Sequence, residues 1–306
     1  MINYPNGFVQ KVTGAFGNVG KEWLSELDSI VETYLEKWNL QSEGPVENLS
    51  YNYVLKVKDE YGNRAILKLG VPNYDFENEI RTLQTYDGEG CVQLLKMDST
   101  DGVMLLEHLL PGTMLVGVEE RLAIKHFVKV WTDIRRKVET NANHPTVEDW
   151  MQAFDRYLEV YPKNEGPIST ENIQLAKNYA HEITNSSEGI ELLHGDLHHE
   201  NILFSDEYGW IAIDPKGVIG DPYFDFVSFL TNQLIDTFNP KQLLKQRVIL
   251  LSEEMQLDND RLLKAAVAMS MLYACWGLED NDPNWENSFR CAKWFEELRG
   301  LDKLNS

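Results

Sequence analysis

Apolar side chains near the start of the chain recur at the spacing of an α-helix. Over residues 22–39 they return every three or four positions, which is the period of an amphipathic helix. The residues of this stripe are Trp23, Leu24, Leu27, Ile30, Val31, Tyr34, Leu35 and Trp38. The pattern predicts a helix over residues 22–39 whose aromatic stripe packs in a core.

Short apolar runs bounded by turn residues replace the helical period in the next part of the chain. Tyr61-Gly62-Asn63 predicts a turn between two strands, and Pro111-Gly112 predicts a linker. The predicted elements are strands at residues 51–57, 64–69, 92–97 and 103–107 and a helix at residues 75–86. This part of the chain is therefore predicted to form a small sheet with one helix.

Helical periodicity returns after the linker and continues to the end of the chain. The predicted helices cover residues 118–138, 148–160, 171–185, 224–236, 240–255, 260–276 and 285–301. A strand-rich part followed by a helical part predicts an α+β fold with two domains, residues 1–108 and residues 109–306.

A polar loop and a hairpin interrupt the helical part at residues 192–214. Two apolar runs, residues 202–204 and 210–213, flank a turn and predict the hairpin. The loop that precedes the hairpin and the acid that ends it would bring Asp196, Asn201 and Asp214 to one end of a small sheet. Such a set suits phosphoryl transfer, in which one acid orients a hydroxyl nucleophile while an amide and a second acid hold magnesium on the ATP phosphates.

Two interpretations of the loop compete. The spacing H-x-D-x-x-x-x-N, met here by His194, Asp196 and Asn201, is that of the kinase catalytic loop. Alternatively, His194, His198 and His199 form a metal site or an ordinary polar loop. A spacing of four between His194 and His198 suits a metal site on a helix, but the glycine and the strand pattern around them disfavour a helix.

The run H-G-D-L-H-x-x-N, followed by I-D-P-K and G-D-P-x-x-D, resembles the aminoglycoside phosphotransferase family, and within it the streptomycin kinase and hydroxyurea kinase branch. The resemblance implies a protein-kinase-like fold of two lobes, with a small antiparallel sheet in the first and helices in the larger second. It implies ATP and Mg²⁺ as cofactors and a small hydroxylated molecule as substrate. Asp196 is then the catalytic base and Asn201 and Asp214 the metal ligands, while His194 and Asp225 support the loop.

The resemblance also implies nucleotide-binding residues in the first lobe. Lys68 in A-I-L-K resembles the strand lysine that holds the α- and β-phosphates. Glu79 resembles the helix glutamate that pairs with this lysine, and Glu77 is its competitor. A solvated edge lysine and a solvated glutamate are the ordinary alternatives.

Two further segments complete the expected nucleotide site. The loop at residues 47–52 would cover the phosphates; it lacks G-x-G-x-x-G, so that Ser50 and Asn52 would offer hydrogen bonds instead. The family hinge contacts adenine through backbone atoms, here around Glu107 and Leu109. Backbone contacts do not separate ATP from GTP.

The net charge of the chain indicates which kinds of ligand it would attract. The formal net charge of −21 disfavours binding to nucleic acid or to an anionic membrane and favours a cationic ligand, although such charge also serves solubility. Glu279 and Asp280 in G-L-E-D-N-D-P could bind cationic groups or form a solvated loop. Asp221 either caps the next helix or lines the substrate site, and Lys216 either reaches the transferring phosphate or forms a surface salt bridge.

Three unpatterned cysteines and an N-terminus without a basic, apolar leader predict a cytoplasmic protein. The expected activity is phosphorylation of an antibiotic such as streptomycin, or of hydroxyurea. The alternatives are a sugar or amino-alcohol kinase of the same fold and a nucleotide-binding protein without activity. A protein kinase is disfavoured because no A-P-E follows Asp214.

Overall fold

The computed structural model describes residues 4–138 and 143–305. The chain divides into two compact units. The first comprises Met1–Thr113 and Leu203–Ile213, and the second comprises Met114–Ile202 and Asp214–Ser306. The division falls after Thr113, where the sequence predicts it after residue 108, and it adds the hairpin after the catalytic loop to the first unit.

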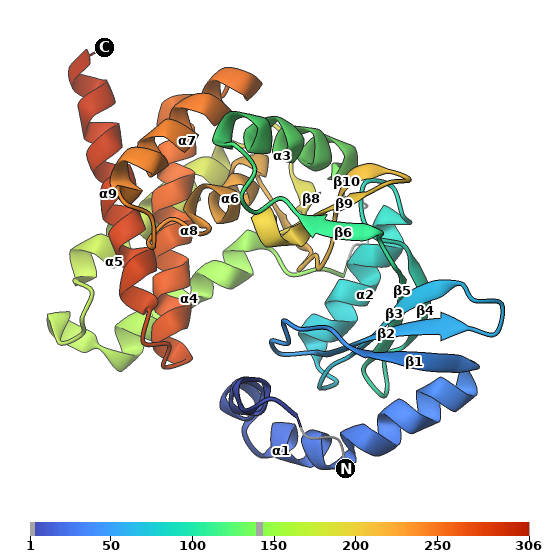
Figure 1. Cartoon of the computed structure of the whole chain (residues 1–306). Helices are drawn as coiled ribbons and strands as arrows, with labels where there is room; N and C mark the ends of the chain where they lie inside the picture. Colours follow the sequence, from blue (N-terminus) through green and yellow to red (C-terminus); the bar gives the residue numbers. More distant parts are fainter. Residues whose placement is uncertain (1–3, 139–142, 306) are drawn as a thin grey trace. The chain divides into compact units, whose positions relative to one another are not determined.

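The first helix, α1 (Asn6–Lys37), starts well before residue 22. Gly17 interrupts it with φ 56° and ψ −125°, a conformation open to glycine alone, so that α1 is two helical arms (Figure 1). The arms pack tightly, since a Cβ on Gly20 would lie 2.7 Å from the carbonyl oxygen of Val12. The early glycines weaken the helical pattern of the first arm, which explains why periodicity predicts only the second.

An antiparallel sheet of five strands forms the rest of the first unit, in the order β1-β2-β3-β5-β4. The strands are β1 (Leu40–Pro45), β2 (Tyr53–Asp59), β3 (Arg64–Leu69), β4 (Leu94–Asp98) and β5 (Val103–Glu107). Helix α2 (Tyr74–Tyr86) follows β3 and is capped by Asn73, whose side chain accepts from the amide of Phe76. Apolar side chains of α1, β2, β3 and β5 share one core. Strand β1 is an exposed edge without alternation, which explains its absence from the prediction.

A second sheet, in the order β10-β9-β6, contains the predicted hairpin. Its strands are β6 (Pro111–Met114), β9 (Ile202–Ser205) and β10 (Gly209–Ala212). Strand β6 occupies the predicted linker, and a cis bond joins Leu110 to Pro111.

Helices make up most of the second unit. They are α3 (Glu120–Ile134), α4 (Val147–Val160), α5 (Thr170–Asn185), α6 (Val227–Thr231), α7 (Pro240–Met255), α8 (Asn259–Glu279) and α9 (Trp285–Asn305), with short 3₁₀ turns η1 (Pro162–Asn164), η2 (His199–Asn201) and η3 (Pro222–Phe226). By length and composition, α8 alone among the described helices could cross a membrane, but it is largely buried among the other helices, as a core helix is.

The helix predicted at residues 224–236 is shorter in the structure. It consists of η3 and the five-residue α6. Buried Arg247 of α7 explains the early end, because its Nη1 donates to the carbonyl oxygens of Leu230 and Asn232 at 3.2 and 2.6 Å. The same guanidinium forms a two-pronged ion pair with Glu120 of α3. Arg247 thus satisfies carbonyls that a continuing helix would have used itself.

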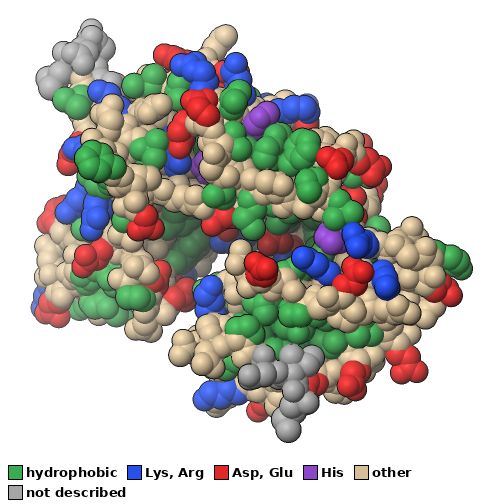
Figure 2. All heavy atoms as spheres, viewed as in Figure 1, with side chains coloured by type: hydrophobic (Ala, Val, Ile, Leu, Met, Phe, Trp, Pro, Cys, Tyr) green, Lys and Arg blue, Asp and Glu red, His purple; other side chains and the backbone are tan. Residues whose placement is uncertain are grey.

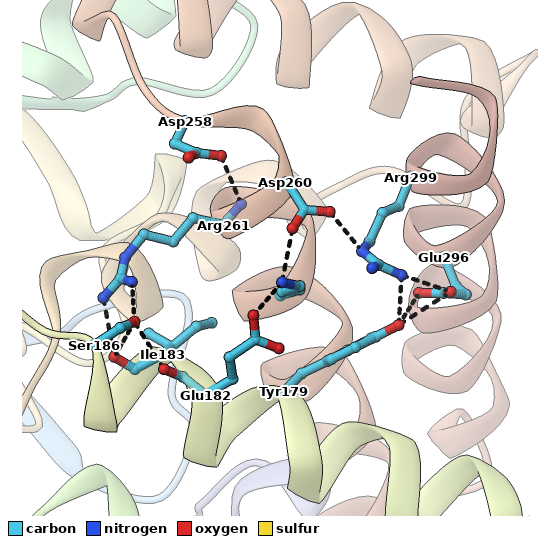
Figure 3. A network of polar contacts seen from close by, with 10 residues as sticks. Tyr179, Glu182, Ile183, Ser186, Asp258, Asp260, Arg261, Glu296 and Arg299 are labelled. Atoms are coloured by element: carbon cyan, nitrogen blue, oxygen red, sulfur yellow. Dashed lines mark hydrogen bonds and ion pairs between the residues drawn. The ribbon is translucent and has the colours of Figure 1, made fainter. Parts of the chain in front are cut away.

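Ion pairs join α8 to its neighbours α5 and α9. Arg299 of α9 donates to Asp260 at 2.8 Å and to Tyr179 at 2.5 Å, and Arg261 donates to Ser186 at 2.6 Å (Figure 3). Several carboxylates of this unit are therefore occupied by structural cations. In Figure 2 the red carboxylates of the viewed face are scattered among basic and apolar side chains rather than gathered in a single patch.

A third small sheet, in the order β11-β8-β7, lies next to the polar loop at residues 194–201. Its strands are β7 (Arg136–Lys137), β8 (Glu191–Leu193) and β11 (Val218–Gly220). The strands have two or three residues each, too few for the alternation that reveals strands in a sequence. The helix predicted at residues 118–138 ends earlier, because Ile134 is the last residue of α3 and strand β7 begins at Arg136.

Candidate active site

The pairing of β8 with β11 places the catalytic loop beside the segment that carries the second acid. Val218 lies opposite Leu193, and the amides of Lys216 and Gly217 donate to the carbonyl oxygen of His194 at 2.8 and 3.1 Å. Residues 214–217 thus run alongside the start of the loop. The paired strands β9 and β10 lie between Asn201 and Asp214, as the sequence predicts. The short β8–β11 sheet adds a second alignment, which the sequence did not predict.

Gly195 lets the loop turn between strand and acid. Its φ is +80°, and a Cβ there would lie 2.8 Å from the Trp150 ring and 3.3 Å from the Lys216 Cβ. Both the conformation and the close approach require glycine. The G of H-G-D is thus a steric requirement of the loop.

The carboxylate of Asp225 accepts hydrogen bonds from the backbone of the loop. Its Oδ1 accepts from the amide of Gly195 at 2.8 Å and its Oδ2 from the amide of His194 at 3.3 Å. The carboxyl is 4% exposed. Burial raises its pKa to about 6, although the two amides act in the opposite direction. The structure thus places Asp225 where the resemblance puts it, against the loop backbone.

His194 orients the next acid from inside the protein. The residue has no exposed surface, and its Nδ1 accepts from the amide of Asp196 at 3.2 Å. The described residues contain no group of three or more His, Cys, Asp or Glu placed to hold a metal ion, so the three histidines of the loop form no such cluster.

Asp196 presents its carboxylate at the surface of the loop. Its side chain is 30% exposed, and Lys216 Nζ lies 3.3 Å from Oδ2. Burial raises the pKa of this carboxyl, but the charges of Lys216, His198 and His194 outweigh burial and lower it. A carboxylate kept ionised in this way can accept a hydrogen bond or a proton from a hydroxyl group.

The two expected metal ligands lie in the same unit. Asn201 Nδ2 donates to the carbonyl oxygen of Asp196 at 2.9 Å, which turns Oδ1 of the amide away from this bond. Asp214 is exposed and has φ 56°, a left-handed conformation that aspartate tolerates better than most residues. An amide oxygen and an exposed carboxylate are ligands that Mg²⁺ accepts, with phosphate oxygens and water completing its shell.

The first unit contains the lysine of the nucleotide site. Lys68 on β3 is paired with Glu79 on α2, with Nζ 2.6 Å from Oε1 and with side chains 5% and 12% exposed. Glu77 instead lies on the exposed side of α2, 3.7 Å from Arg81. The geometry selects Glu79 over its competitor.

The loop between β1 and β2 approaches the same end of the sheet. Tyr53 pairs with Leu69 and Val54 with Lys68, so that residues just before Tyr53 lie next to the end of β3. Asn52 packs there: its Oδ1 lies 2.3 Å from the position that a Cβ on Gly70 would take. Ser50, also in this loop, lies 3.4 Å from Lys11 of α1.

The expected hinge begins at the end of β5. Glu107 accepts from the amide of Gln93 at 2.8 Å, and burial raises the pKa of its carboxyl. Leu109 is buried. Leu110 accepts from the amide of Asp206 through its carbonyl oxygen at 2.8 Å, which ties the segment to the β9–β10 hairpin.

The acids expected at the substrate are placed differently from one another. Asp221 is 4% exposed and bonded to Arg261, Ser187 and the amide of Tyr223, so it caps η3, as one of the two predicted alternatives has it, and its carboxylate is already hydrogen-bonded within the protein. Glu279 forms a two-pronged bond with Arg156 at 2.8 and 2.9 Å, which already neutralises it.

Asp280 is the acid of this group with an unfavourable electrostatic environment. It is exposed at the end of α8. Burial, Glu279 and Asp282 raise the pKa of its carboxyl, and Lys216 opposes them. A cation bound beside Asp280 would relieve the repulsion between these carboxylates.

Two tryptophans within the predicted helices 148–160 and 260–276 lie next to the loop that carries Asp196. Trp150 of α4, which contacts Gly195, meets Trp276 of α8 edge to face with ring centroids 5.3 Å apart. Lys216 Nζ lies 5.9 Å from the centre of the Trp276 ring. No local signal distinguishes these tryptophans, because only the packing of α4 and α8 brings them to the loop.

Two solved structures that share this fold are kinases of small molecules. A choline kinase from Streptococcus pneumoniae matches with a TM-score of 0.64 at 12% identity and covers 89% of this chain and 99% of its own. An aminoglycoside phosphotransferase solved with ADP and hygromycin B matches with a TM-score of 0.63 at 10% identity, over 89% and 98% of the two chains. These likenesses show the protein-kinase-like α+β fold. The family match given next shows that this chain is an ATP-dependent phosphotransferase with hydroxyl groups as acceptors.

The family follows from the sequence match. Residues 37–281 match the model of the aminoglycoside/hydroxyurea antibiotic resistance kinases, and the chain belongs to this family. It is 26% identical to a streptomycin 6-kinase of Streptomyces griseus, over 91% of this chain and 92% of the relative. It is 30% identical to a hydroxyurea phosphotransferase of Kitasatospora aureofaciens, over 92% and 82%. The resemblance expected from the catalytic loop is confirmed.

Proposed function

We propose that this kinase transfers the γ-phosphoryl group of Mg-ATP to a hydroxyl group of a cationic aminocyclitol antibiotic such as streptomycin. One observation carries the proposal: the partly exposed carboxylate of Asp196 lies 3.3 Å from Lys216 Nζ, which in turn lies 5.9 Å from the centre of the Trp276 ring and interacts electrostatically with Asp280. The set offers a base, an aromatic surface and a negative charge to one acceptor.

The chemistry assigned to each group follows from its contacts. Asp196 orients the acceptor hydroxyl and receives its proton as the oxygen attacks the γ-phosphorus, while the bond from the γ-phosphorus to the β,γ-bridging oxygen breaks and ADP leaves. Asn201 Oδ1 and Asp214 would hold Mg²⁺, which would supply positive charge to the phosphates. Lys68 holds the α- and β-phosphates, and Glu79 fixes its position. Positioning and charge neutralisation supply most of the rate.

Lys216 is proposed to serve the transferred group. Its ammonium is close enough to Asp196 to keep that acid ionised before the acceptor binds. The transferred phosphoryl group is an anion that arrives between the acceptor and ATP, and a half-exposed lysine can turn towards it. Lys216 does form the salt bridge that the alternative interpretation predicts, but its partner is Asp196, the proposed catalytic base.

The proposal that the acceptor is cationic rests on the Trp150–Trp276 pair and on Asp280. Aromatic faces attract guanidinium and ammonium groups, and a carboxylate crowded by other carboxylates gains most from a cation. Charges more than about 8 Å apart are screened at physiological salt, so the net charge of −21 can speed encounter but cannot hold the ligand. Specific contacts must do so.

Hydroxyurea is the second candidate acceptor, favoured by the 30% identity to a hydroxyurea phosphotransferase. It is small and uncharged, so its use would not depend on Asp280. A sugar or amino-alcohol kinase is the third candidate. We also propose that the enzyme works in the cytoplasm without nucleic acid or membrane partners; the three cysteines are free and buried, as suits a reducing compartment.

The test is ATP consumption with streptomycin, hydroxyurea, amino alcohols and neutral sugars at low and high salt, with the product identified by mass spectrometry. Streptomycin should be preferred, and its KM should rise with salt. Asp280→Asn should raise this KM about 10-fold, the effect of losing one charge-assisted contact. Glu254→Gln on α7, an exposed acid remote in sequence, is the matched control.

The outcomes separate the candidates. Preference for hydroxyurea without a salt effect would move the assignment to that acceptor. Preference for neutral sugars, unaffected by salt or by Asp280→Asn, would move it to a metabolite kinase. ATP binding without transfer to any acceptor would favour the nucleotide-binding protein without activity.

A further inference from the structure

The first arm of α1 lies outside the segment that matches the family. The match begins at residue 37, whereas α1 starts at Asn6. The arm is nevertheless part of the core of the first unit, because Phe8 and Val12 are 1% and 0% exposed. It is therefore a fixed element of the first unit.

The first arm packs against the strand that follows the β1–β2 loop. The ring of Phe8 lies 5.8 Å from the ring of Tyr53, and Tyr4, just before the helix, lies 5.1 Å from Tyr53, edge to face. Tyr53 is the first residue of β2. Leu49, within the loop, packs against the same apolar cluster. The arm thus packs against both the loop and the first residue of the strand that follows the loop.

Lys11 projects from this arm to the loop. Its Nζ lies 3.4 Å from the Ser50 hydroxyl oxygen. The loop itself, residues 46–52, contains no Lys, Arg or His and includes the acid Glu47. Lys11 is thus a cation that α1 contributes to a loop whose own sequence supplies none.

The strand register brings this cation to the lysine end of the sheet. Val54 pairs with Lys68, and Asn52 packs against Gly70, just after β3. The loop therefore lies at the end of β3 that Lys68 occupies. A triphosphate held by Lys68 has to pass beneath the loop, within reach of groups that the loop carries.

We infer that Lys11 is a second phosphate-binding lysine, supplied by the N-terminal arm of α1 and held at the loop by Ser50. The inference rests on the proposed function, since it assumes that Lys68 marks the position of the ATP phosphates. Lys11 binds the β- and γ-phosphates from the loop side while Lys68 binds from the sheet. A cation from α1 takes over the task that glycine-rich loops perform with backbone amides.

The test measures nucleotide binding by calorimetry, with Mg-ATP, ADP and AMP as probes. Lys11→Met should weaken Mg-ATP binding about 10-fold, as expected for loss of one charge-assisted phosphate contact, and leave AMP binding unchanged. Lys11→Arg should restore most of the affinity. Lys21→Met, an exposed lysine on the second arm, should behave like the unchanged protein.

The pattern across probes decides the inference. Unchanged Mg-ATP binding by Lys11→Met would overturn it. Equal weakening of ATP and AMP binding would also overturn it, because Lys11 would then shape the loop without contacting the phosphates. The proposed function fails differently: if the unchanged protein binds Mg-ATP but phosphorylates no acceptor, the acceptor assignment is lost while the binding comparison still decides the role of Lys11.

Discussion

The ammonium of Lys68 lies 2.6 Å from a carboxylate oxygen of Glu79, and both side chains are almost withdrawn from solvent. Removing one member of a buried ion pair leaves the other charge uncompensated, at a cost of roughly 3–5 kcal/mol. We predict that Glu79→Gln lowers kcat/KM for ATP. Lys68→Met should lower it further, because this substitution also removes the contact between the lysine and the phosphates.

A double-mutant cycle measured on kcat/KM and on urea unfolding checks this pair. The double variant should cost less than the sum of the single variants, since neither charge is left alone. Glu77→Gln, on the exposed side of α2, is the control and should change neither quantity by more than a small factor. Strict additivity would contradict a coupled pair.

Replacement of Asp196 tests the base. Asp196→Asn keeps the size of the side chain but cannot take a proton, so turnover should fall by about 10²-fold or more. Mg-ATP binding and the melting temperature should stay close to those of the unchanged protein. Asp206→Asn in the exposed hairpin turn is the control. Near-normal turnover of a folded Asp196→Asn protein would remove Asp196 from the mechanism.

Replacement of Asp214 tests the metal ligand. Asparagine tolerates the left-handed φ of 56°, so Asp214→Asn should leave the backbone unstrained while removing the negative charge. We predict that it weakens ATP binding in the presence of magnesium more than Asp196→Asn does, and that the difference disappears when magnesium is removed with EDTA. Calorimetric titration gives both values. Equal Mg-ATP affinity in the two variants would show that Asp214 is not the main ligand.

The pH dependence of stability tests the environment of Asp225. Its carboxyl has a pKa of about 6 in the folded protein, against an ordinary 3.8. Between these pH values the unfolded chain has released the proton and the folded protein retains it, so the free energy of unfolding falls as pH rises through this window. The total change is roughly 3 kcal/mol.

The measurement compares the unchanged protein with Asp225→Asn in urea at several pH values between 4 and 7. The difference is informative because buried His199, whose pKa is lowered to about 3 chiefly by burial, contributes the opposite slope in both proteins. The variant should lack the Asp225 contribution, and its turnover should also fall because the amides of His194 and Gly195 lose an acceptor. Identical slopes would place the Asp225 pKa near its ordinary value.

The sequence by itself determined the features that depend on neighbouring residues. His194, Asp196 and Asn201 belong to one short loop. Their spacing alone predicts a shared chemistry, because residues so close in sequence also lie close in space. The strand that carries Lys68 is local in the same sense: six residues, 64–69, were predicted and found as β3. The long periodic helices were predicted too, as at Pro240–Met255, because a pattern repeated over several turns is little affected by single residues that depart from it.

Only the tertiary structure decided which distant groups meet. Glu79 rather than Glu77 faces Lys68 because of the way α2 is turned on its sheet. Asp221 is bonded to Arg261 because α8 packs against η3, and Glu279 is bonded to Arg156 because α8 packs against α4. These pairings give structural partners to two acids whose roles the sequence left open. Strands β8 and β11 pair within the second unit although each is too short to show a pattern of its own. Charge and hydrogen-bonding capacity are properties of single residues, whereas the partner that satisfies them is set by packing between elements far apart in the chain.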